Sequence, residues 1–184
     1  MKASSLTGTG NYFEDFKVGE VLRHRRGKTI EATENVVITN MVMNSASSHF
    51  DDLVMRDTIF KKRLQFGGVT ASLIVGMASQ DTSENALADL GMTNIRFKVP
   101  VFHGDTLYAY SEVLSRNELG RDDAGEVVFR HWGVNQDDRV VLEGAREVLV
   151  KKRSAWGEKR ARPPYRGRSP DCVSITHTRA APGR

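Results

Sequence analysis

Hydrophobic and polar positions change their spacing along the chain, and each change predicts a new element. Residues 21–30 are predicted to form a strand. Thr33 is a good N-cap for a helical pattern that ends near Met43. The small and polar residues 44–52 favour a loop, and such a loop can hold a site. Residues 69–79 are apolar or small on nearly every side, which predicts a helix that is buried all round.

Four further strands are predicted in the second half of the chain. Each is rich in Val, Tyr, Phe or Leu and is bounded by Gly, Asp or Asn turns. They cover residues 94–99, 105–114, 126–134 and 139–150. This succession indicates an antiparallel meander. One long buried helix followed by four antiparallel strands predicts an α+β fold in which the sheet wraps around the helix.

The length of 184 residues fits one domain with a different composition at each end. We expect residues 1–11 to be disordered, residues 12–152 to form the domain, and residues 153–184 to be a flexible tail rich in Pro and Arg. From residue 151 onward there are ten basic and two acidic residues, whereas residues 1–150 hold 17 basic and 21 acidic ones. The domain itself is therefore mildly acidic, and no nucleic-acid-binding face is expected on it.

Hydrophobic runs in this chain are too short for membrane insertion. No segment reaches the roughly 18 consecutive apolar residues that span a bilayer, and residues 1–10 lack the apolar core of a secretory signal. Cys172 is the single cysteine, so neither a disulfide nor a cysteine metal site is available. We therefore expect a cytoplasmic protein that binds no metal and contacts no membrane.

The loop and the start of the long helix carry the candidate chemistry. His49 lies in the loop, and an imidazole titrates near pH 6.5, so its protonation can change at neutral pH. Gly67 and Gly68 come just before the predicted helix start, which lets a ligand approach the backbone amides there. The alternatives are a loop histidine that only packs or caps, and glycines that only permit helix packing.

Three segments resemble the MaoC-like, (R)-specific enoyl-CoA hydratase family. His49 and Asp51 match the His and the trailing Asp of the family's active-site signature. The Phe66-Gly67 pair is similar to the Phe-Gly entry to the family's central helix. Residues 97–107, FKVPVFHGDTL, resemble the family's Phe-x-x-Pro-Val-x-x-Gly-Asp-Thr-Leu turn, and this match is the most specific of the three.

The resemblance covers about residues 12–152 and implies a single hot-dog fold, an antiparallel sheet around one long central helix. It also implies a homodimer, because family sites lie at the subunit interface and an apolar sheet edge needs a cover. The implied substrate is an acyl-CoA thioester, with CoA as part of the substrate and no further cofactor. The implied reaction is reversible hydration of a short, branched or dicarboxylic enoyl-CoA of the itaconyl- or mesaconyl-CoA type.

The family pattern suggests roles for the loop residues. His49 would perform both proton steps, as the base toward water and as the acid toward Cα. Asn44 stands where most members have a catalytic Asp, and it would hold the water by its amide without ionising. The Met43-Asn44 pair is similar to the branch of mesaconyl- and itaconyl-CoA hydratases. The substitution at position 44 can therefore mark a subfamily.

The positive end of the long helix is expected to receive the thioester carbonyl. The backbone amides of Gly68, Val69 and Thr70 are the candidates for this oxyanion hole. Asp51 could orient His49, but a cap for a short helix near Leu53 is the preferred interpretation.

The histidines and basic residues outside the loop are interpreted mainly as structural or solvent-exposed residues. His24 lies in a strand and His103 in a turn, and both are expected to be structural. The cluster 61–63, Lys-Lys-Arg, is either an exposed helix face or a contact for CoA phosphates. The basic tail is a solvated end, with contacts to CoA phosphates or to a polyanion as alternatives.

Other functions stay open at this point. Dehydration of 3-hydroxyacyl chains on a carrier in lipid synthesis would need a longer apolar channel beside the central helix. A non-catalytic acyl-CoA-binding subunit would fit the absence of an acid at Asn44, and a stable heterodimer would favour it. Thioesterase chemistry is the most distant alternative.

Overall fold

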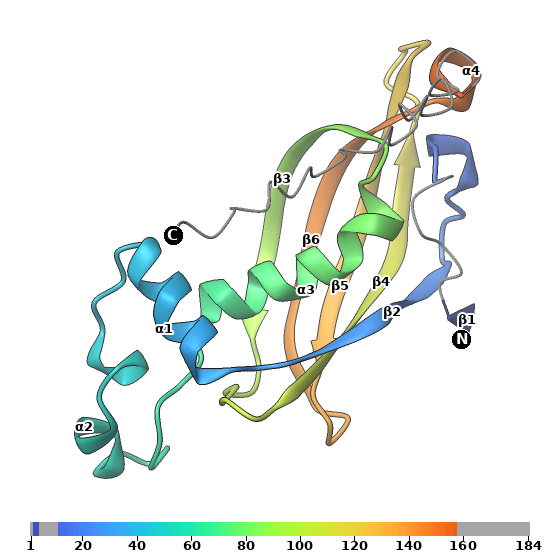
Figure 1. Ribbon diagram of the computed structural model, residues 1–184. Helices are drawn as coiled ribbons and strands as arrows, with labels where there is room; N and C mark the ends of the chain where they lie inside the picture. Colours follow the sequence, from blue (N-terminus) through green and yellow to red (C-terminus); the bar gives the residue numbers. More distant parts are fainter. Residues whose placement is uncertain (1, 4–10, 158–184) are drawn as a thin grey trace, which may run out of the picture.

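The computed structural model describes residues 2–3 and 11–157, and Figure 1 shows its elements in chain order. The strands are β1 (Lys2–Ala3), β2 (Val21–Thr29), β3 (Ala86–Phe97), β4 (Thr106–Asn117), β5 (Ala124–Val134) and β6 (Val140–Lys151). The helices are α1 (Ala32–Met41), α2 (Asp52–Arg56), α3 (Gly67–Thr82) and α4 (Arg153–Trp156), with 3-10 turns η1 (Phe13–Asp15) and η2 (Ser47–His49).

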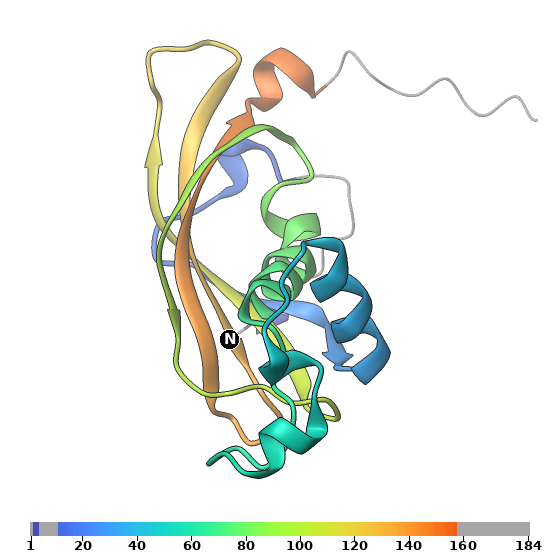
Figure 2. The same ribbon diagram turned by 90° about the vertical axis from the view of Figure 1, so that its left-hand side faces the viewer.

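The strands within the described residues form one sheet in the order β1-β2-β4-β5-β6-β3. β1 pairs with β2 in parallel, and every other neighbouring pair is antiparallel. The sheet curves, and α3 lies along its concave side (Figure 2). α1 and α2 gather at the end of the sheet where α3 begins (Figure 1). The expected α+β arrangement, a sheet wrapped around one long helix, is therefore present.

Close packing on the sheet holds α3 in place. Ile74 and Ala78 of α3 are fully buried. A Cβ atom on Gly133 of β5 would lie only 2.2 Å from Cδ1 of Ile74, so a glycine is needed where the helix crosses this strand. The core cluster around Ile74 also contains Ile30, Val101, Leu107, Ala109, Val141 and Leu142. Burial of each large apolar side chain contributes about 1.5–3 kcal/mol, so this cluster anchors the helix against the sheet.

Most predicted strands are confirmed, but β3 differs in length and in partner. The strands predicted at 21–30, 105–114, 126–134 and 139–150 correspond to β2, β4, β5 and β6. β3 begins at Ala86, well before the predicted residue 94. It pairs with β6 and not with β4, so the predicted four-strand meander is wrong for this strand. The partner of β3 follows some fifty residues later in the chain, and local sequence patterns do not report such pairings.

The first helix begins earlier than predicted. α1 starts at Ala32 after Glu31, so Thr33 lies in the first turn and is not the N-cap. The second cap prediction is confirmed, because the Asp51 carboxylate accepts hydrogen bonds from the amides of Leu53 and Val54 at the start of α2. Asp51 therefore stabilises the turn that follows His49.

The central helix is buried on one side only, which corrects the expectation of burial all round. Gly67 and Gly68 lie within its first turn and not before it. Ser72, Gly76 and Gln80 are exposed on the side that faces away from the sheet. A single sheet covers only one face of a helix, and in the described chain no other element covers this stripe.

Two short elements lie in segments that were expected to be disordered or flexible. Lys2–Ala3 forms β1 beside β2, and Arg153–Trp156 forms α4. The indole Nε1 of Trp156 donates to the carbonyl of Asp123 at 3.1 Å, which attaches α4 to the sheet. Residues 1, 4–10 and 158–184, which include Cys172 and most of the basic tail, lie outside the described residues.

β3 is an edge of the described sheet and carries exposed hydrophobic side chains. It pairs with β6 on one side, and its other side has no strand partner among the described residues. Its exposed hydrophobic side chains, 37% to 57% accessible, are Leu87, Leu90, Met92, Ile95 and Phe97. An edge strand with free backbone groups and apolar side chains offers a surface that a second strand can cover.

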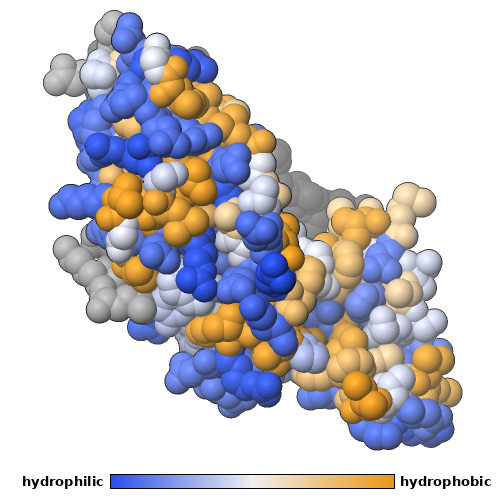
Figure 3. All heavy atoms as spheres, turned by 180° about the vertical axis from the view of Figure 1, so that it is seen from behind, coloured by the Kyte–Doolittle hydropathy of each residue, from blue (hydrophilic) through white to orange (hydrophobic). Residues whose placement is uncertain are grey.

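Further hydrophobic surface lies on the lobe formed by α1, α2 and their connections. Figure 3 shows this lobe beside the outer face of the sheet, where hydrophobic and hydrophilic side chains are interspersed. The most exposed apolar side chains of the lobe, at least 69% accessible, are Met41, Met43, Leu53 and Ile59. Within the part of the chain that the structure describes, no helix is long and apolar enough to cross a membrane.

Candidate active site at the start of the central helix

A cavity of about 310 Å³ lies at the N-terminal end of α3. It is lined by His49, Leu64, Gln65, Gly67, Thr70, Phe97, Lys98, Val99, Pro100, Val101 and Val141. The lining joins η2, the first turn of α3 and the end of β3, which are far apart in sequence. Mainly apolar walls with a few polar groups are typical of a small-molecule site.

His49 has a defined orientation and tautomer in this cavity. Its Nδ1 atom lies 3.0 Å from the carbonyl oxygen of Leu64. A carbonyl oxygen can only accept a hydrogen bond, so Nδ1 carries the proton in the neutral ring and Nε2 keeps a lone pair. The ring also packs against Phe66, with 5.3 Å between the ring centroids. The prediction that His49 belongs to a site is consistent with this geometry, because Nε2 is available as a base.

Asn35 holds the segment that orients His49, and the sequence did not indicate this role. Its buried amide donates from Nδ2 to the Leu64 carbonyl at 3.3 Å and accepts at Oδ1 from the Phe66 amide at 3.0 Å. The hydroxyl of Thr39, one turn later in α1, donates to the same Oδ1 at 3.3 Å. The only sequence signal is a pair of polar residues four apart on the inner face of α1.

Asn44 is held by hydrogen bonds within the loop that leads to His49. Its Oδ1 atom accepts a hydrogen bond from the backbone amide of Ala46 at 3.0 Å, and its backbone amide donates to the Thr39 carbonyl at 3.0 Å. Met43 before it has a positive φ of 59°, so the chain turns sharply here. Asn44 shapes the loop that leads to His49, and it is not among the residues that line the cavity.

The first turn of α3 has free amides, and its residues Gly67 and Thr70 line the cavity, whereas Gly68 and Val69 do not. The first amides of a helix have no carbonyl partner within the helix. The amide of Thr70 is already bonded to the Phe66 carbonyl at 3.0 Å, so of the three predicted oxyanion donors Gly68 and Val69 keep a free N–H and Thr70 does not. Gly67 lines the cavity, and a Cβ atom there would lie 2.9 Å from the ring of Phe97.

Lys98 brings a positive charge to the cavity wall. Its Nζ atom lies 2.7 Å from a carboxylate oxygen of Glu143, and Arg130 bonds the same carboxylate at 3.0 Å. Hydrogen bonds from Lys98 and then from Arg130 hold the pKa of Glu143 below its usual range. Lys62 and Arg63 of the predicted phosphate cluster have other contacts, since Lys62 lies over the Phe102 ring and Arg63 pairs with Asp52.

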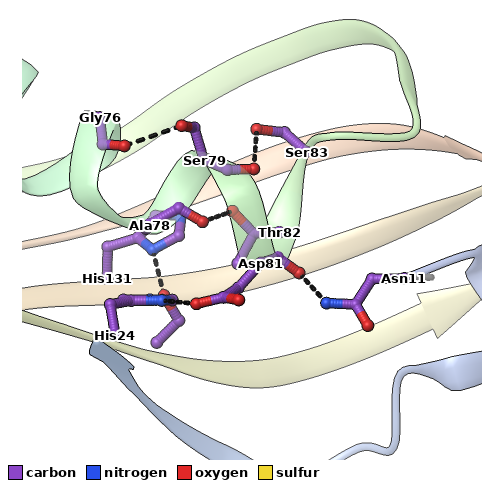
Figure 4. Close-up of polar contacts among 10 residues, drawn as sticks. Asn11, His24, Gly76, Ala78, Ser79, Asp81, Thr82, Ser83 and His131 are labelled. Atoms are coloured by element: carbon purple, nitrogen blue, oxygen red, sulfur yellow. Dashed lines mark hydrogen bonds and ion pairs between the residues drawn. The ribbon is translucent and has the colours of Figure 1, made fainter. Parts of the chain in front are cut away.

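A second polar cluster lies under the other end of α3 (Figure 4). His24 Nδ1 lies 2.6 Å from Asp81 Oδ2, and His24 Nε2 lies 2.7 Å from Ser111 Oγ. Ser111 Oγ also lies 2.6 Å from His131 Nδ1. Burial, followed by the charges of Arg146 and His24, lowers the pKa of His131 to about 3.

This cluster has the Ser, His and Asp groups of a hydrolase, but the serine that would be its nucleophile is fully buried. Asp81 lines the groove between β2 and α3. His24, Asp81, Ser111 and His131 are each at most 3% exposed. The serine oxygen lies between two imidazoles and has no free direction toward a ligand. The cluster therefore joins β2, α3, β4 and β5, and the structural interpretation of His24 is confirmed.

A wider groove of about 760 Å³ runs between β2 and the exposed side of α3. Arg25, Arg26 and Lys28 line its β2 side, and Ser72 and Gly76 line its helix side. Within the described residues it is not lined by any histidine, so the candidate active site is the cavity that contains His49.

Comparisons with known proteins show the family and the fold of this chain. The model of a family described as mesaconyl-CoA hydratase matches residues 3–152. The chain is 32% identical over 155 residues to a β-methylmalyl-CoA dehydratase of Chloroflexus aurantiacus, covering 82% of this chain and 43% of the relative. It is 31% identical to a mesaconyl-CoA hydratase of Cereibacter sphaeroides, covering 80% of this chain and 43% of that protein.

The fold has a matching solved structure. A Mycobacterium tuberculosis protein described as a double hot-dog fold superposes with a TM-score of 0.71 at 26% identity, covering 80% of this chain and 46% of that one. This chain thus spans less than half the length of the curated relatives it matches. The resemblance carried by His49, Phe66-Gly67 and residues 97–107 is confirmed: the fold is the hot-dog fold, and the chain belongs to the mesaconyl-CoA hydratase family.

Proposed function

We propose that the chain carries the active site of a hydro-lyase that adds water reversibly to a short, branched or dicarboxylic enoyl-CoA of the mesaconyl- or itaconyl-CoA type. The names of the family and of its curated relatives support this substrate class. The observation that carries the proposal is the geometry of His49, whose Nδ1 is bonded to the Leu64 carbonyl while its ring lines the cavity at the start of α3.

In the forward reaction His49 Nε2 removes a proton from water, and the resulting hydroxide oxygen adds to Cβ of the enoyl group. The π electrons move toward the thioester carbonyl, where negative charge develops on the oxygen. The amides in the first turn of α3, including Gly68 and Val69, stabilise this charge together with the helix dipole. The protonated His49 then gives its proton to Cα, which restores the neutral ring. No proton step needs a cofactor, and CoA takes part only as a portion of the substrate.

We propose that a second copy of the chain covers the free edge of β3. The exposed Leu90, Met92 and Ile95 side chains and the unpaired backbone of this edge favour a symmetric strand pairing. The length of the curated relatives, more than twice the matched region, agrees with two such units acting together. Neither a nucleic acid nor a membrane is needed for this function, and we propose a cytoplasmic location.

A non-catalytic acyl-CoA-binding subunit is the second candidate. The observation that favours it is Asn44, which cannot ionise at a position where the wider family resemblance implies a catalytic Asp, and whose Oδ1 accepts a bond from the Ala46 amide. Such a subunit would bind the thioester without turnover.

The enoyl-thioester absorbance band distinguishes these functions. We would follow it with a panel of enoyl-CoAs from crotonyl- to mesaconyl- and itaconyl-CoA, for the unmodified protein, His49→Ala and the control His103→Ala. His103 lies in a turn and does not line the cavity. Loss of the band with the unmodified protein and the control, but not with His49→Ala, is expected. Tight acyl-CoA binding with no turnover of any substrate would instead support the binding subunit.

A further inference from the structure

Gln65 has an unpartnered amide oxygen in the wall of the cavity. The side chain is only 7% exposed, and its Oε1 atom has no hydrogen-bond partner. Gln65 also lines the same cavity as His49. A buried carbonyl oxygen without a donor is unfavourable, so native proteins rarely keep one unless a water or a ligand completes it.

The position of Gln65 is fixed by its backbone. Its amide donates to the Val101 carbonyl at 2.8 Å, and the amide of the preceding Leu64 donates to the Ser48 carbonyl at 2.9 Å. Leu64 also supplies the carbonyl that orients His49. The acceptor of the His49 proton and the unpartnered amide therefore belong to consecutive residues of one segment, which Asn35 holds from α1.

We propose that Gln65 is a further catalytic residue, whose Oε1 atom accepts a hydrogen bond from the attacking water. This inference rests on the proposed hydratase function. The water has two hydrogens, and one is directed to His49 Nε2 while the other is directed to Gln65 Oε1. Its oxygen lone pair is then left to point at Cβ of the substrate.

The bonds of the step balance with these two partners. The O–H bond toward His49 breaks, an N–H bond forms at Nε2, and a C–O bond forms as the C=C π bond opens. The O–H bond toward Gln65 stays intact and becomes the hydroxyl of the product. Gln65 therefore stays neutral throughout and acts only as an acceptor.

This assignment gives Gln65 the role expected of Asn44 from the family pattern. Asn44 Oδ1 accepts a bond from the Ala46 amide, whereas Gln65 Oε1 is buried without a partner in a residue that lines the cavity containing His49. A glutamine with a purely structural role would use its buried side-chain oxygen to accept a bond from another part of the protein. Within the described residues, Oε1 of Gln65 accepts no such bond.

The first test compares Gln65→Met with the control Gln80→Met. Methionine keeps the length and volume of the side chain and removes the acceptor, and Gln80 is an exposed glutamine on α3. For Gln65→Met we expect kcat to fall by about 10- to 100-fold with KM within about threefold, at an unchanged or higher Tm. Gln65→Glu keeps an oxygen acceptor and should recover part of kcat, with an added ionisation in the pH profile. Unchanged kcat, or a lower Tm that explains the loss, would overturn the inference.

A second test does not depend on turnover. In the His49→Ala background we would measure by calorimetry the binding of butyryl-CoA and of 3-hydroxybutyryl-CoA, with and without Gln65→Met. The hydroxyl group should tighten binding by about two- to tenfold, and Gln65→Met should remove that increment. If no enoyl-CoA is hydrated but this increment disappears, the proposed function fails and the acceptor role of Gln65 stands. If the hydroxyl group does not tighten binding, or if Gln65→Met leaves the tighter binding unchanged, the proposed role of Gln65 is overturned.

Discussion

The carbonyl oxygen of Leu64 lies 3.0 Å from Nδ1 of His49, and this single contact decides which ring nitrogen of the histidine can act as a base. The same carbonyl accepts a bond from Asn35 in α1. The orientation of the imidazole is therefore set by a helix that is not part of the cavity. A supporting contact of this kind is expected wherever a catalytic group must keep one tautomer.

Asn35→Ala should weaken both the fold and the site. The substitution leaves the Phe66 amide without its acceptor, and we expect a loss of about 1–3 kcal/mol in the free energy of unfolding. The kcat of hydration should fall as well, because residues 64–66 are released. Urea denaturation and steady-state kinetics measure these effects, with Asn40→Ala at an exposed position of the same helix as the control. Equal behaviour of the two variants would contradict the role of Asn35.

Gly67→Ala should narrow the site. The new methyl group would lie 2.9 Å from the Phe97 ring, so the ring must move. A strained contact of this type costs about 1–3 kcal/mol, which corresponds to an increase of about 5- to 150-fold in the Kd of butyryl-CoA. Gly76→Ala is the matched control on the same helix, where a Cβ atom has no neighbour within 4 Å. The control should bind normally and be about 0.5–1 kcal/mol more stable. Normal binding by Gly67→Ala would show that the ring yields at no cost.

His131 should make the stability depend on pH. Its folded-state pKa of about 3 is lower than the value near 6.5 in the unfolded chain, so the unfolded chain binds more protons between these values. The contribution of His131 is complete above about pH 6.5 and is lost at about 1.4 kcal/mol per pH unit as the pH falls toward 3. In His131→Gln the free energy of unfolding should be lower at pH 7 but should decline less steeply in acid. His103→Gln is the control and should keep the unmodified slope. An unmodified slope in His131→Gln would mean that other groups dominate the acid sensitivity.

Met92→Lys should separate the proposed dimer. Met92 is 44% exposed on β3, the edge without a strand partner among the described residues. A charge placed there must lose water when a second copy pairs with this edge, and dimerisation should weaken by at least tenfold. Sedimentation velocity over a concentration series measures the change. Val18→Lys places the same charge at an exposed apolar residue far from this edge in sequence, and it should leave the oligomeric state unaltered. A monomeric unmodified protein would end the dimer proposal.

The sequence by itself was sufficient to predict the long helix, most of the strands and the loop that contains His49. These features depend on local patterns, namely an apolar segment, runs of β-branched and aromatic residues, and a loop of small polar residues. The family that these motifs predicted was confirmed by the comparisons, and the motifs could be recognised because they are local in sequence.

Only the tertiary structure decided which residues share the site. The pairing of β3 with β6 and the bond from Asn35 to the Leu64 carbonyl join positions that are distant in the chain. The unpartnered amide oxygen of Gln65 has no sequence pattern that would predict it. The family resemblance implied that Asn44 acts together with His49, but its amide oxygen accepts a bond from Ala46 in the turn. Whether a polar group is free to act depends on the partners that folding brings to it, and those partners are set by packing between elements.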